Sequence, residues 1–145
     1  EGDFVAPLPQ QVPAGVAGLA KTGVAGGRLR DLNEALMSVP PGFTVHRKLE
    51  RGRERRKAML ANANERVVDW SAAEDLALAS VLADGIPIRL TGEDVERGTF
   101  SHRHAVLHDA ANGDQYVPLQ SMPQARAAFE IHNSPLTENA PLGFE

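Results

Sequence analysis

Residues 71–90, with the sequence SAAEDLALASVLADGIPIRL, decide the fold class of this chain. Ser71 and Glu74 have the spacing of a capping box, in which Ser71 caps a helix and Glu74 reaches back to the backbone amide of the cap. Residues 76–83 are apolar on nearly every side. A helix that is apolar all round is typically buried. The pattern therefore predicts a buried helix over this stretch.

A glycine turn and a short strand follow the predicted helix. Asp84-Gly85 closes the helix, residues 86–90 read as a strand, and residues 127–132 read as a second strand. The order helix, glycine turn, strand is typical of an α/β fold with a parallel sheet and flanking helices. The polar residues 91–94 then lie at the carboxyl end of the first strand. Open α/β sheets bind ligands at that edge.

The remaining C-terminal half is predicted from weaker local patterns. We expect a helix over residues 99–108, a tight turn at Asn112-Gly113 and a short extended piece over residues 116–119. Residues 134–138 are expected to start a final helix that ends with the chain.

The first half divides into a linker and a helical lead-in. Residues 1–27 are rich in Gly and Pro and are predicted to be a partly extended linker with one short helical patch. Residues 28–66 form the lead-in, with helices over 28–39 and about 44–62. Residues 67–145 form the partial α/β domain. The chain does not start with Met and stops within a predicted helix, so we expect it to be an internal fragment.

The second lead-in helix holds almost half of the 15 basic residues of the chain. Two interpretations remain open for it. A solvated face with local ion pairs is favoured, because Glu50 and Glu54 are interleaved with the basic residues. The alternative is a phosphate-binding patch. The basic residues are Arg47, Lys48, Arg51, Arg53, Arg55, Arg56 and Lys57.

Composition excludes several classes of function. The 145 residues contain no cysteine, which rules out disulfides, thiolate catalysis and cysteine-bound zinc. The net charge of −4 argues against a generic nucleic-acid-binding domain. No apolar run reaches the length of a membrane span. We therefore expect neither nucleic acid nor membrane as a partner.

The histidines and one glutamate are the residues most able to carry chemistry. On the predicted helix His104 and His108 lie one turn apart, a spacing that can bind a metal, while His102 projects elsewhere. A third ligand is missing, so we expect no metal site and favour a structural role or the lining of an anionic pocket. By local physics alone Glu138 is an ordinary glutamate at the start of a helix. The residues by themselves therefore predict only an incomplete α/β domain.

A long stretch of the chain resembles the decarboxylating dehydrogenase component of the 2-oxoglutarate dehydrogenase complex. The resemblance is carried by TGEDVERGTFSHRHAVLHD at 91–109, YVPLQ at 116–120, NSPLTENA at 133–140 and LGFE at 142–145. Upstream, NEAL at 33–36, PPGF at 40–43 and HRK at 46–48 resemble the segment that precedes the same domain. The resemblance covers the chain from about residue 29 to its end.

This resemblance implies the first part of a transketolase-like pyrimidine-binding domain, which holds thiamine diphosphate. Glu138 aligns with the glutamate that activates the cofactor by a hydrogen bond to its pyrimidine ring. Leu136 and Phe144 have the apolar character that the surroundings of this carboxylate require. His102 and His104 are candidates for contact with the substrate. The diphosphate and its magnesium ion are expected on a domain that this chain lacks.

The resemblance also implies a role for the whole protein. That role is oxidative decarboxylation of 2-oxoglutarate in the tricarboxylic acid cycle, with transfer of the succinyl group to a lipoyl domain. The expected partners are the rest of the same chain, a second copy in a homodimer and the dihydrolipoyl succinyltransferase component. The expected location is the cytoplasm of a bacterium or the mitochondrial matrix of a eukaryote. The alternatives are a non-oxidative 2-oxoglutarate decarboxylase, another 2-oxo acid dehydrogenase, or a stand-alone metal- or nucleic-acid-binding module.

Overall fold

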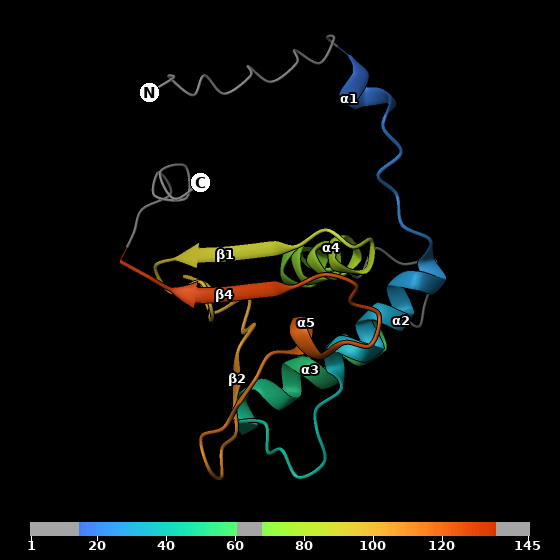
Figure 1. Cartoon of the computed structure of the whole chain (residues 1–145). Helices are drawn as coiled ribbons and strands as arrows, with labels where there is room; N and C mark the ends of the chain where they lie inside the picture. Colours follow the sequence, from blue (N-terminus) through green and yellow to red (C-terminus); the bar gives the residue numbers. More distant parts are fainter. Residues whose placement is uncertain (1–14, 61–67, 136–145) are drawn as a thin grey trace, which may run out of the picture.

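The computed structural model describes residues 15–60 and 68–135 of the chain (Figure 1). Its helices and strands follow one another in the order α1 (Val16–Leu19), α2 (Gly26–Met37), α3 (Arg47–Met59), α4 (Trp70–Ala83), β1 (Ile88–Gly92), β2 (Leu107–His108), β3 (Gln115–Tyr116), α5 (Pro118–Ser121) and β4 (Phe129–Asn133). None of the described helices is both long enough and apolar enough to cross a membrane.

The main sheet consists of β1 and β4, which run parallel. Ile88 lies opposite Phe129 at one end and Gly92 lies opposite Asn133 at the other. The predicted pair of parallel strands, with helices alongside, is confirmed. A second small sheet pairs β2 with β3 in antiparallel fashion. The predicted turn at Asn112-Gly113 lies between these two strands, and Gly113 has a φ of 82°.

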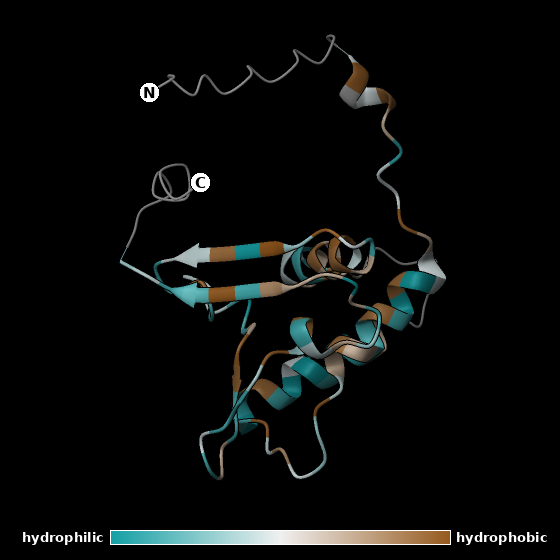
Figure 2. Ribbon diagram, in the orientation of Figure 1, coloured by the Kyte–Doolittle hydropathy of each residue, from teal (hydrophilic) through white to brown (hydrophobic). Residues whose placement is uncertain are grey.

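The core lies between α2, α4 and the sheet. Leu32 and Leu36 of α2, Leu82 of α4, and Phe129 and Ile131 of β4 belong to one buried cluster. Figure 2 shows apolar residues along α4 and in both strands of the main sheet. Helix α2 packs against α3, α4 and α5, which brings the lead-in and the sheet together. The buried character predicted for α4 is confirmed.

The predicted cap of α4 is wrong. The helix starts two residues earlier, and the carboxylate of Asp69 accepts a 2.8 Å hydrogen bond from the amide of Ala72. Aspartate is as good a cap as serine. Ser71 and Glu74 instead contact a distant loop: the Ser71 hydroxyl donates to the carbonyl of His102, and Glu74 pairs with Arg103. These tertiary partners replace the predicted capping box.

The predicted helix over residues 99–108 is also wrong. This stretch is a loop that ends in β2. Ser101 and His104 have φ angles of 53° and 47°, which a right-handed helix cannot contain. Likewise, Pro118 and Leu119, predicted as part of an extended piece, start the short helix α5. Proline is well suited to a first helical position because its missing N–H would be unpaired there anyway.

Candidate functional site at the carboxyl edge of the parallel sheet

The carboxyl ends of β1 and β4 are tied together by hydrogen bonds. The amide of Ser134 donates to the carbonyl of Gly92 at 2.9 Å, and the Thr91 hydroxyl donates to the Ser134 hydroxyl at 3.0 Å. The side chain of Asn133 accepts from the amide of Glu96 at 3.1 Å. The segment leaving β4 is therefore held beside the loop that leaves β1. Both segments lie at the edge where open parallel sheets bind ligands.

The loop that leaves β1 folds back on itself. The carbonyl of Arg97 accepts hydrogen bonds from the amides of Arg103 and His104 at 2.9 and 3.0 Å. The amide of Ala105 donates to the carbonyl of Glu96 at 2.7 Å. The Arg97 side chain pairs with Asp94 and donates to the Ser101 hydroxyl. This internal bonding replaces the hydrogen bonds of the expected helix.

Arg103 fastens the loop to α4. Its guanidinium binds both oxygens of Glu74, at 2.5 and 3.2 Å, and also donates to the carbonyl of Val95 at 2.7 Å. This contact lowers the pKa of Glu74, chiefly through the hydrogen bond from Arg103, while burial works in the opposite direction. Arg103 was not singled out from the sequence, because its partners lie far away along the chain. Its position between two histidines is its only local signal.

Gly98 makes room for the ring of His102. Its φ is 79°, and a Cβ at this position would lie 2.5 Å from Cε1 of His102. His102 also lies near Glu74, with 3.9 Å between Nε2 and the carboxylate, and near the exposed ring of Phe100. The backbone conformation therefore favours glycine at position 98, and a Cβ there would also force the His102 ring to move.

Replacing Gly98 with Ala is expected to destabilise the protein more than the same change at Gly113. Both glycines have positive φ, which costs roughly 1–2 kcal/mol with a side chain, but a Cβ at Gly113 meets nothing within 4 Å. Urea denaturation of both variants should show the larger loss for Gly98→Ala. The double variant Gly98→Ala/His102→Ala should return to the Gly113→Ala level. Equal losses at the two glycines would contradict the steric role of His102.

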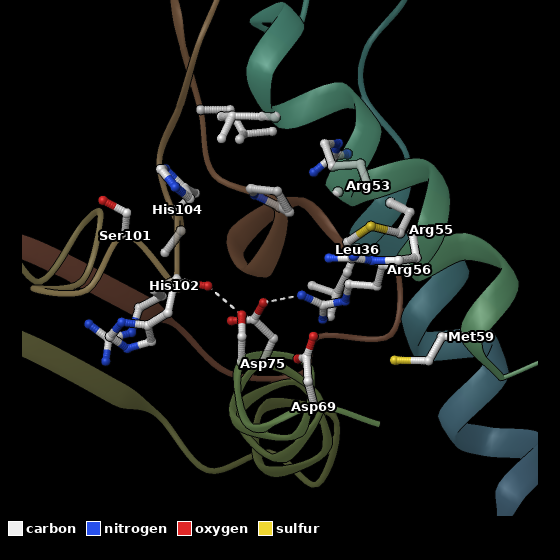
Figure 3. A pocket seen from close by; sticks show the side chains of 18 of the residues that line it. Leu36, Arg53, Arg55, Arg56, Met59, Asp69, Asp75, Ser101, His102 and His104 are labelled. Carbon is white, nitrogen blue, oxygen red and sulfur yellow. Dashed lines mark hydrogen bonds and ion pairs between the residues drawn. The ribbon is translucent and has the colours of Figure 1, made fainter. Parts of the chain in front are cut away.

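His102 and His104 line one pocket of about 380 Å³, shown in Figure 3. The pocket lies between α3, the start of α4 and this loop. Burial lowers the pKa of His104 below its ordinary value, and the nearby charge of Arg97 acts in the same direction, while a hydrogen bond with the backbone of Ser101 opposes both. His104 thus favours its neutral form in the folded protein. The structure therefore places both predicted histidines in the lining of the same pocket.

The lowered pKa of His104 predicts a pH-dependent stability. Between the folded pKa and the ordinary value of 6.5, the unfolded chain binds more protons than the folded one. The free energy of unfolding should therefore fall as the pH drops below about 6.5. His104→Asn should weaken this dependence because it removes the titrating imidazole. Asparagine is chosen because it tolerates a positive φ. The same substitution at the exposed His108 is the control, and a slope unchanged by His104→Asn would refute the prediction.

The predicted one-turn spacing of His104 and His108 is wrong, because no helix joins them. His108 is exposed on β2 and His132 is exposed on β4. Residues 15–60 and 68–135 contain no group of three His, Asp or Glu side chains that could hold a metal ion. Three further predicted site residues, Leu136, Glu138 and Phe144, lie outside the described residues.

Two parallel strands, the helices packed alongside them and a polar loop at the carboxyl edge define an α/β domain. The chain belongs to the family of the transketolase pyrimidine-binding domain, which matches residues 66–145. It is 53% identical over 117 residues to the 2-oxoglutarate dehydrogenase E1 component of Staphylococcus aureus strain N315, covering 81% of this chain and 13% of that protein. The proteins of the same name from strains JH9 and Newman are equally identical, with 12% of each covered. The chain thus spans about an eighth of the length of these relatives.

Proposed function

We propose that this chain is part of a 2-oxoglutarate dehydrogenase that decarboxylates 2-oxoglutarate on thiamine diphosphate and passes the succinyl group to a lipoyl domain. The observation that carries the proposal is the 53% identity to proteins named 2-oxoglutarate dehydrogenase E1 component. The family assignment argues against a stand-alone metal- or nucleic-acid-binding module.

The described residues are compatible with a cofactor ring at the carboxyl edge of the sheet. Asn133 and Ser134, the first residues of the NSPLTE segment, are held there beside the loop that leaves β1. Thiamine diphosphate, when bound, supplies the electron sink for the loss of carbon dioxide from a 2-oxo acid. We assign to Glu138 the hydrogen bond to the pyrimidine ring. Leu136 and Phe144 would exclude water, raise the pKa of this carboxyl and let it share a proton.

Other parts of the proposal concern the complete protein. On the family resemblance, we assign the diphosphate and its magnesium ion to another domain of the complete protein. The proposed partners are a second copy of the protein and the dihydrolipoyl succinyltransferase component with its lipoyl domain. We propose a cytoplasmic location, since the similar proteins named above are bacterial.

A substrate assay on the complete protein tests this function. With thiamine diphosphate and magnesium present, 2-oxoglutarate should support faster reduction of an artificial electron acceptor than pyruvate does. Transfer of the succinyl group to an isolated lipoyl domain would support the dehydrogenase, whereas release of succinic semialdehyde alone would favour the non-oxidative decarboxylase. Absence of thiamine-dependent turnover with every 2-oxo acid would refute both.

A further inference from the structure

The pocket in Figure 3 has a strongly cationic wall formed by α3. Lys48, Arg53, Arg55 and Arg56 all line it from this helix. Helical residues three apart share one face, which places Arg53 and Arg56 on the same side of α3. In Figure 3 both side chains extend from α3 toward the pocket, and Asp75 faces Arg56 from α4. The basic helix is therefore more than an evenly solvated surface.

Two guanidinium nitrogens in this wall are buried without a partner. Nη2 of Arg53 and Nη2 of Arg56 have no hydrogen-bond acceptor among residues 15–60 and 68–135. The remaining nitrogens of Arg56 are used, because Nε donates to Asn33 and Nη1 donates to Asp75. Arg53 has neither a hydrogen bond nor an ion pair within those ranges. Leaving a buried charged donor unpaired is costly, so the described residues leave this cationic wall incompletely satisfied.

The carboxylates of the pocket do not satisfy these donors. Asp75 is engaged by Nη1 of Arg56, and Asp69 caps α4 by accepting from the amide of Ala72. Burial lowers the pKa of Arg53, and its nearest acidic neighbours, Glu50 and Glu54, only partly offset this effect. An arginine stays charged even so. The pocket consequently retains an excess of positive charge that no described side chain neutralises.

The pocket also has an apolar wall and the size of a small-molecule site. Its volume of about 380 Å³ lies within the usual range of ligand pockets. Leu36, Met37, Leu49, Met59, Leu107 and Leu119 contribute apolar lining. A ligand that matches both walls would carry an oxyanion at one end and an apolar body at the other. Arginine pairs well with phosphate, because its fork of donors matches two phosphate oxygens.

We propose that this pocket binds a small organic phosphate, whose phosphate group pairs with the guanidinium of Arg53 on the cationic wall while its apolar body covers the leucine and methionine wall. The pocket shares residues 101–105 with the loop that leaves β1, but Arg53 lies on α3 and phosphate binding needs no catalytic turnover. A failed decarboxylation assay would therefore leave this proposal standing.

Calorimetric titration of the complete protein with phenyl phosphate and with inorganic phosphate tests the site. Phenyl phosphate should bind more tightly, because it also covers the apolar wall. Arg53→Gln should weaken its binding by about 10- to 100-fold, the loss expected for hydrogen bonds to a charged group. Arg53→Lys should give an intermediate loss, since the charge remains and the fork is removed. Thermal melts establish that each variant is folded.

Arg51→Gln is the matched control. Arg51 lies two residues away on the same helix, is exposed and does not line the pocket, yet its replacement changes the net charge equally. Affinity close to that of the unmodified protein is expected for this variant. An equal loss in Arg51→Gln and Arg53→Gln would overturn the proposal by showing non-specific attraction. Failure of both probes to bind at millimolar concentration would also overturn the proposal. An acidic segment of the complete protein that fills the pocket would give this result.

Discussion

Replacing Glu138 with Gln should lower thiamine-dependent decarboxylation of 2-oxoglutarate by about 10²–10⁴-fold in the complete protein, which is the size of general acid–base effects. Glutamine keeps the shape of the side chain but cannot share a proton as a carboxylate does. The loss should appear in kcat, measured as release of carbon dioxide at saturating substrate. The free energy of unfolding should stay nearly the same.

Glu130→Gln provides the control for this experiment. Glu130 is an exposed residue of β4 that pairs with Arg89 at 2.8 Å. Its replacement removes the same charge a few residues upstream, and loss of an exposed pair costs about 0–1 kcal/mol. Turnover should be retained in this variant. Full turnover in Glu138→Gln would refute the role assigned to Glu138.

Asp75→Asn is expected to give the largest loss of stability, about 3–5 kcal/mol, because it leaves the buried charge of Arg56 uncompensated. The side chain of Arg56 is only 14% exposed and that of Asp75 only 11%, and Nη1 of Arg56 lies 2.5 Å from Oδ2 of Asp75. Arg56 also bonds to Asn33, whose amide donates back to the carbonyl of Arg56 at 3.1 Å. Asp75, Arg56 and Asn33 thus join α4, α3 and α2, so the loss should be visible in urea denaturation.

Two further variants distinguish a broken pair from a merely altered surface. Asp84→Asn removes the partner of Arg28 in an exposed pair at the end of α4, with side chains 58% and 42% exposed, and should cost less than about 1 kcal/mol. Arg56→Met/Asp75→Leu should be more stable than Asp75→Asn alone. Burial raises the pKa of Asp75 even though Arg56 opposes the shift. The removal of the Asp75 carboxylate from water therefore has a larger effect than its attraction to Arg56. A double variant less stable than Asp75→Asn would contradict this account.

Local sequence patterns predicted helices α2, α3 and α4 and the two parallel strands. Helices α2 and α4 follow runs of apolar residues, and β1 and β4 follow short apolar stretches, so their signals lie within a few residues of one another. Segment boundaries were less accurate. Helix α4 begins two residues before the predicted start, because Asp69 and Ser71 are both suitable caps and only tertiary contacts engage Ser71 elsewhere.

The loop that follows β1 was not predictable from local pattern. Residues 99–108 contain few helix-breaking residues after Gly98, yet Ser101 and His104 adopt positive φ. The carbonyls of Glu96 and Arg97, together with the contact between Arg103 and Glu74, stabilise that conformation. Glu74 is 29 residues from Arg103 in the sequence. A helical periodicity search does not detect pairs at such a distance.

By itself the sequence determined the class of the domain, its family resemblance and the candidate role of Glu138, because these depend on contiguous motifs. Tertiary structure decided which charged side chains are buried and which remain unpaired. Arg51 and Arg53 are the same type of residue and lie on the same helix, yet of the two only Arg53 lines the pocket and is partly buried there. The difference arises because burial and pairing depend on neighbours from α2, α4 and the loop after β1, which are brought together only when the chain folds.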